Sequence, residues 1–165
     1  MVANVKRRPR RRPLNQLRFA VLPISLLLCQ RAHAADDISG LWVDQNRDGQ
    51  IEIVSCGTQT MCGRIVSILD VTLPPTPRDA LNENAELRNR PICGLEVLGD
   101  LKKDGASWNG WVYDPHRGKV FQVDIKLADG GTLMVHGYSG AKLFGETELW
   151  TRPSSEIHRC SRSAN

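Results

Sequence analysis

The sequence predicts an all-β protein, an eight-stranded antiparallel up-and-down barrel preceded by a signal peptide. Three observations support this fold class. Short runs that alternate apolar and polar residues follow one another between Gly, Asp and Pro turns. A tryptophan motif stands at each end of the patterned part, Gly40-Leu41-Trp42 and Trp150-Thr151-Arg152. Closing eight strands into a barrel removes the exposed edges, so we expect the first and last strands to meet.

Residues 1–34 have the three parts of a secretory signal peptide. They contain eight basic side chains and no acidic one, an apolar run from Phe19 to Cys29, and the small residues of Ala32-His33-Ala34. The apolar run is shorter than the roughly 20 residues that span a bilayer, so we expect no stable membrane insertion. We expect cleavage after Ala34 and a periplasmic or secreted protein.

Cleavage would reverse the sign of the net charge. The whole chain has 22 basic and 18 acidic residues, a formal charge of +4. Without the eight basic residues of 1–34, 14 basic residues remain against 18 acidic ones, a charge of −4. No basic patch remains, so we expect no nucleic-acid partner. The rest of the chain divides into a barrel domain, 35–152, and a C-terminal tail, 153–165.

The first three expected strands are Leu41–Gln45, Gln50–Ser55 and Met61–Leu69. Turn residues 46–49 separate the first two, and the third is rich in β-branched residues. The segment 70–90 then interrupts the pattern, with at most a short helical turn near 79–87. A loop of this length in a compact domain is usually a lid, a binding loop or disordered.

The remaining strands resume the alternation. We expect them at Ile92–Leu101, Trp108–Tyr113, Val120–Leu127, Thr132–Tyr138, and Gly140–Gly145 leading into Glu146–Thr151. Gly- or Asp-containing turns separate them. In the last strand, Glu146 and Glu148 share a face with Trp150. We expect that face to point outward into solvent; if it points inward, the two carboxylates become an acid–base pair inside the barrel.

Four cysteines follow the signal segment, and an even number in an oxidising compartment favours disulfides. Cys56 and Cys62 flank residues 57–61, which are typical of a hairpin turn, so we expect these two to be bonded. The pairing of Cys93 and Cys160 stays open. The cysteine spacing does not fit a zinc site.

Residues 44–51 match the first eight positions of an EF-hand calcium loop. Ser55 stands where that loop needs a bidentate Glu, and the flanking segments predict strands instead of helices. We therefore expect neither a metal site nor a cofactor. No nucleophile–base set typical of a hydrolase is found either.

Ordered motifs carry a resemblance across nearly the whole chain after residue 39. They are Gly40-x-Trp42, Ile51-Glu52-Ile53, Cys62-Gly63-x-Ile65, Asp79-x-x-Asn82, Arg88-x-Arg90, Gly94-x-x-x-Leu98, Trp108-x-Gly110, Tyr113-Asp114-Pro115, Gly118-Lys119, Gly137-Tyr138, Leu143-Phe144-Gly145 and Trp150-Thr151-Arg152. This set resembles an uncharacterised family of secreted bacterial proteins, a domain of unknown function whose known fold is lipocalin-like. One departure is Glu83, where the family usually has proline.

The resemblance implies a lipocalin-like fold and export, and it implies no activity. In such barrels the tryptophan of the first strand packs beneath an arginine that follows the last strand. We therefore expect structural roles for Gly40, Trp42, Trp150 and Arg152. A cation–π contact between Trp42 and Arg152 is worth about 0.5–2 kcal/mol.

The 70–90 segment is the main candidate for function. Asp79, Asn82, Arg88 and Arg90 either pin this loop to the barrel or contact a ligand at the barrel mouth, where arginines suit a carboxylate or phosphate head group. We expect an exported, non-enzymatic barrel that binds a small, partly apolar (amphipathic) ligand. The alternatives are an envelope protein that acts through its surface around a side-chain-filled barrel, and a small hydrolase or isomerase using Asp79, Arg88 or Glu148. The sequence leaves the oligomeric state open.

Overall fold

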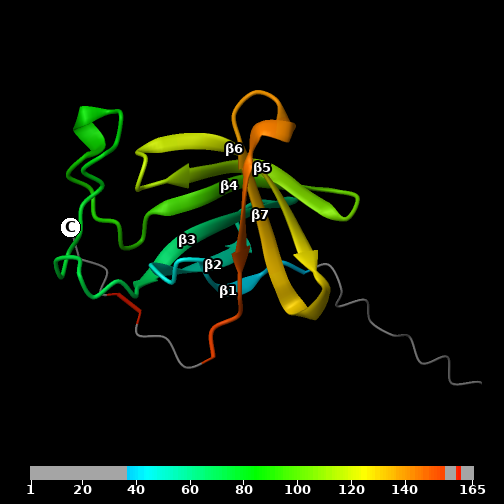
Figure 1. The fold of residues 1–165 in the computed structure, drawn as a ribbon, viewed down its shortest axis with the longest axis horizontal. Coiled ribbons are helices and arrows are strands. Elements are labelled where there is room, and N and C mark those ends of the chain that lie inside the picture. Colours follow the sequence, from blue (N-terminus) through cyan, green and yellow to red (C-terminus); the bar gives the residue numbers. More distant parts are fainter. Residues whose placement is uncertain (1–36, 155–158, 161–165) are drawn as a thin grey trace, which may run out of the picture. The chain divides into compact units, whose positions relative to one another are not determined.

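Eight antiparallel strands form one sheet that curls into a nearly closed barrel (Figure 1). The computed structural model describes residues 37–154 and 159–160. The strands are β1 (Gly40–Val43), β2 (Gly49–Ser55), β3 (Thr60–Ile68), β4 (Glu96–Asp104), β5 (Ser107–Asp114), β6 (Lys119–Ala128), β7 (Thr132–Tyr138) and β8 (Glu146–Trp150). Each strand pairs with the next one along the chain. The predicted all-β, up-and-down fold class is confirmed.

The barrel closes where the chain enters and leaves it. Val43 and Thr151 form an antiparallel bridge, with N···O distances of 2.8 and 3.0 Å between their backbones. The Arg152 guanidinium carbon lies 3.7 Å from the centroid of the Trp42 ring, and the Trp42 indole N–H donates to the carbonyl of Ile38. Gly40 has φ +99°, and a Cβ there would lie 2.8 Å from a guanidinium nitrogen of Arg152. Glycine is therefore needed for this close approach.

Side chains on the inner faces of the strands form one apolar core. The fully buried members are Ile38, Trp42, Ile53, Leu98, Leu101, Val123, Ile125 and Leu133. They alternate with outward-facing residues along each strand, as a curved sheet with one buried face requires. The alternation in 120–127 that predicts a strand places Val123 and Ile125 in this core, within β6.

Most strand boundaries differ slightly from the prediction, and the largest difference is the start of β4. β4 begins at Glu96 instead of Ile92, because Gly94 adopts φ +82° and the chain from 92 to 95 turns before it joins the sheet. The segment 140–145, which leads into the last strand, contains a 3₁₀ helix, η3 (Lys142–Phe144). Two further 3₁₀ turns are η1 (Ala85–Leu87) and η2 (Asp129–Gly131).

Two disulfides are present, as the cysteine count predicts. One joins Cys56 and Cys62 across the β2–β3 turn. The other joins Cys93, just before β4, to Cys160 in the C-terminal tail. The tail is also held by hydrogen bonds from the backbone N–H of Cys160 to the carbonyl of Val66 and from Arg159 to both carboxylate oxygens of Glu52. Residues 159–160 therefore lie against the outer side of β2 and β3.

The expected signal peptide, 1–34, lies outside the described residues. Within the described part of the chain, no helix has the length and apolar character needed to cross a membrane.

Candidate functional site

The strand order places four connections at one end of the barrel. Consecutive antiparallel strands alternate in direction, so the β1–β2, β3–β4, β5–β6 and β7–β8 connections share this end. A cavity of about 450 Å³ lies inside the barrel there, and all four connections contribute residues to its lining. We call this end of the barrel the mouth.

The wall of the cavity is mainly aliphatic. It is formed by side chains of seven strands, including Ile51, Ile65, Val97, Val112, Phe121, Val135 and Trp150. Gly137 on β7 leaves space in this wall, because a Cβ there would have only the Val112 side chain near it, at 3.6 Å. Apolar walls of this kind with a few polar groups are typical of small-molecule sites. The cavity also shows that the barrel is not filled by its own side chains.

Acidic side chains line the mouth of the cavity: Asp44, Asp48, Asp114, Glu146 and Glu148. Three of them face basic groups. Asp114 and Glu146 contact Arg117, at 3.3 and 2.5 Å, and Asp48 lies 3.4 Å from a ring nitrogen of His116.

The other two acids, Asp44 and Glu148, form no direct ion pair among the described residues; the charge of Glu148 adds to the effect of Glu146 and Asp114 in raising the pKa of Arg117. The Asp44 carboxylate accepts hydrogen bonds from the backbone N–H groups of Asp48 and Gly49, at 2.8 and 2.7 Å, which close the β1–β2 turn. Burial raises the pKa of Asp44, and the nearby charges of Asp48 and Glu148 raise it further against the effect of these hydrogen bonds. Glu148 accepts from the indole N–H of the buried Trp150, at 2.8 Å.

This arrangement corrects the expectation for the last strand. We expected Glu146 and Glu148 to face outward, but both line the cavity on the same side of β8 as Trp150. Their carboxylates remain exposed because the mouth is open to water. A charged side chain can therefore occupy an inner-face position near the end of a barrel without the penalty of full burial.

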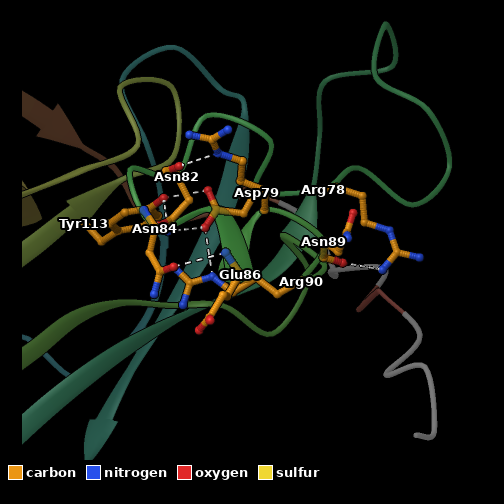
Figure 2. Close-up of polar contacts among 9 residues, drawn as sticks. Arg78, Asp79, Asn82, Asn84, Glu86, Asn89, Arg90 and Tyr113 are labelled. Carbon is orange, nitrogen blue, oxygen red and sulfur yellow. Dashed lines mark hydrogen bonds and ion pairs between the residues drawn. The ribbon is translucent and has the colours of Figure 1, made fainter.

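The β3–β4 loop is held by a buried polar network, shown in Figure 2. Asp79 is fully buried. One carboxylate oxygen accepts from the Tyr113 hydroxyl at 2.6 Å, and the other accepts from Asn82 Nδ2 and Arg90 Nε, each at 2.8 Å. Asn82 Nδ2 also donates to the Tyr113 hydroxyl oxygen at 2.8 Å. A buried carboxylate with this many donors is a satisfied structural element.

Further contacts fix the loop. Arg88 donates from Nε to the Asn82 carbonyl, at 2.8 Å. The Leu81 carbonyl approaches Gly118 so closely that a Cβ there would lie 1.8 Å from it, and the backbone N–H of Glu83 donates to the Gly118 carbonyl. The loop is thus fastened to the β5–β6 turn.

The four polar residues singled out in the sequence therefore come together, beside the cavity but outside its lining. Asp79, Asn82, Arg88 and Arg90 do not belong to its lining. Their neighbours Pro77, Arg78, Ala80 and Leu81 do. Of the two roles that the sequence allowed, the geometry favours pinning: the polar residues hold the loop, and the intervening residues cover the mouth.

Sequence reasoning missed two members of this region. Tyr113 was read only as part of the Tyr113-Asp114-Pro115 motif, yet its hydroxyl joins the loop to the barrel. From the sequence, Asp44 belongs to the first expected strand and stands at the first position of the EF-hand match, with no role in a binding site, yet it lines the cavity. Within the described residues, no group of three or more His, Cys, Asp or Glu side chains is arranged to hold a metal ion.

One solved structure and one protein family are similar to this chain. A solved structure described as "Protein HP1028 from the human pathogen Helicobacter pylori belongs to the lipocalin family" is similar to the chain, with 26% sequence identity and a TM-score of 0.62. The match covers 72% of this chain and 84% of that one. No curated protein is significantly similar in sequence. Residues 40–152 match the family described as "Uncharacterized protein conserved in bacteria (DUF2147)". The chain is therefore a member of the DUF2147 family of bacterial proteins, built on a lipocalin-like barrel.

Proposed function

We propose that this protein is exported and binds a small, partly apolar molecule in the cavity of its barrel. The observation that carries the proposal is the cavity of about 450 Å³ with an aliphatic wall and a polar mouth. Cavities of roughly 300–1,000 Å³ are the usual size of small-molecule sites. An eight-stranded barrel is wide enough to hold one such ligand. Lipocalin-like barrels typically bind small hydrophobic ligands.

The cavity also counts against the alternative function, in which the protein acts only through its surface. That alternative needs a barrel filled by its own side chains, and Gly137 and the surrounding aliphatic residues leave the interior open. In this proposal Asp79, Asn82, Arg88 and Arg90 influence binding indirectly, by holding the part of the loop that covers the mouth.

We also propose that the protein is exported to an oxidising compartment. The two disulfides favour an oxidising compartment. N-terminal sequencing of protein recovered from the periplasm of its own host tests the proposed export. The expected first residue is Ala35, and recovery of a cytoplasmic form that retains residues 1–34 would contradict it.

Binding is tested with a neutral apolar fluorophore, N-phenyl-1-naphthylamine, whose emission rises when it leaves water. We expect saturable, one-to-one enhancement with the native protein. Gly137→Leu should abolish most of it, because the new side chain projects into the cavity. Gly137→Ala is the matched control and should bind nearly as the native protein does, since its added Cβ meets only an ordinary contact.

Native mass spectrometry of protein purified from its own periplasm complements this assay by detecting a co-purifying ligand. If the folded native protein takes up no fluorophore, or if Gly137→Leu binds as well as the native chain, cavity binding is wrong and the surface-interaction alternative replaces it.

A further inference from the structure

The charges at the cavity mouth do not balance. Five acidic side chains line the cavity, against the two arginines Arg78 and Arg117 and the titratable His116. Arg117 is already held between Asp114 and Glu146. Arg78 donates to the carbonyl of Asn89 at 2.7 Å. The lining therefore carries a net negative charge. Asp44 and Glu148 form no direct ion pair among the described residues, although the charge of Glu148 adds to the effect of Glu146 and Asp114 in raising the pKa of Arg117.

Asp44 and Glu148 lie diagonally on opposite sides of the barrel seam, and the charge of Glu148 acts on Asp44. Val43 and Thr151 pair across β1 and the end of β8, so Asp44 follows this bridge on one side and Glu148 precedes it on the other. Beyond the bridge the direct backbone pairing ends, and the Gln45 side-chain oxygen accepts the N–H of Leu149 instead, at 2.9 Å. Both carboxylates line the cavity next to the buried indole of Trp150.

The charge of Glu148 contributes, after burial and the charge of Asp48, to raising the pKa of Asp44, as expected for two like charges beside an apolar wall. A cation between them would remove the repulsion and gain two charge-assisted contacts. The adjacent aromatic ring of Trp150 is a further favourable surface for a cation.

We propose that the ligand of this cavity is a cationic amphiphile: an amine or quaternary ammonium head held by Asp44 and Glu148, with its apolar tail against the aliphatic wall. The inference rests on the proposed cavity binding and adds the sign of the head group. It reverses the expectation from Arg88 and Arg90 of an anionic head, because those two arginines lie outside the cavity lining.

The direct test compares three ligands of equal tail length: octyltrimethylammonium, octan-1-ol and octanoate. Each is titrated against protein loaded with N-phenyl-1-naphthylamine, and its displacement constant is measured. We expect the cation to bind at least about tenfold more tightly than octanoate, a difference of one or two charge-assisted contacts. The alcohol should lie between them, and the preference should shrink as NaCl is raised because salt screens exposed charges.

The double variant Asp44→Asn with Glu148→Gln should bring the cation and the anion to within about twofold of each other, as expected when the charge contribution is removed. Octan-1-ol and the fluorophore are titrated against the same variant, so that the result is the ratio of the cation and anion constants measured on one protein. Glu96→Gln is the matched control, because Glu96 pairs with Arg64 and does not line the cavity. This variant should keep the native preference.

Binding in the cavity and the positive charge of the head group can be refuted separately. If the fluorophore binds and octanoate displaces it as well as octyltrimethylammonium does, the cationic head group is wrong while cavity binding stands. The same conclusion follows if the cation preference survives in the double variant. If the fluorophore does not bind at all, the proposed cavity binding fails and this inference falls with it.

Discussion

Replacing Tyr113 by phenylalanine should destabilise the protein far more than the loss of one surface hydroxyl would. The hydroxyl donates to the fully buried Asp79 carboxylate at 2.6 Å and accepts from Asn82 at 2.8 Å. Its removal leaves one oxygen of Asp79 without a donor among the described residues, while the other keeps Arg90 and Asn82. A hydrogen bond to a charged group contributes about 1.5–3 kcal/mol, and a buried unsatisfied acceptor adds a penalty. We therefore expect a loss of about 2–3 kcal/mol.

The measurement is urea unfolding of the native protein and the variant, supported by calorimetry. For a domain of this size each kcal/mol corresponds to about 3 °C in Tm, so the expected decrease is about 6–9 °C. Tyr138→Phe is the matched control: the hydroxyl of Tyr138 makes no hydrogen bond within the described residues, and the side chain lines the cavity. If the two variants lose stability equally, the network around Asp79 does not hold the loop as we describe.

Three further outcomes are expected. Trp42→Ala should lower the free energy of unfolding, measured in urea, by about 3–5 kcal/mol. The double variant with Arg152→Ala should lose less than the sum of the two single losses, because the two side chains share one contact at 3.7 Å. Full additivity would count against that contact. Replacing Cys93 and Cys160 by serine should reduce stability by about 4 kcal/mol, against about 2 kcal/mol for the other pair, because their disulfide closes a loop with a sequence separation of 67 instead of 6; urea midpoints of the two variants check the order. Asp44 has a raised pKa in the folded state, so its contribution favours folding below the unfolded pKa and is lost as pH rises through the folded pKa. As pH rises from the unfolded pKa of an aspartate, about 4, through the folded pKa, the unfolding free energy of Asp44→Asn should therefore rise relative to that of the native protein; parallel pH profiles of the two would refute this.

The strands could be predicted from the sequence because period-2 alternation is a local property. Val123 and Ile125 alternate with polar residues, and the buried face of β6 follows directly from them. The start of β4 could not be predicted this way. Ile92 looks like a strand residue, but the chain turns at Gly94 to pass from the loop into the sheet, and that turn depends on contacts with Ile65 in β3.

The candidate site was predictable only in outline. The length of the 70–90 segment indicated a loop at the mouth, but its charged residues satisfy one another, which a sequence cannot show before their partners are known. The prediction that Glu146 and Glu148 face outward was wrong, because it followed the charge of these two residues and not the apolar Trp150 on the same face. In the structure Trp150 sets the inward direction, and Glu146 and Glu148 follow it because the spacing along a strand leaves them no other side.

The bridge between Val43 and Thr151 joins the first and last parts of the barrel, so that the sheet forms a ring. With this bridge, each of the eight strands has a neighbour on both sides. A circularly permuted chain, with a linker between residues near the bridge and new ends at the exposed Gly130-Gly131 turn, would keep the seven strand pairings and the bridge. The position of the termini in this fold is thus free to change without altering the cavity at the opposite end.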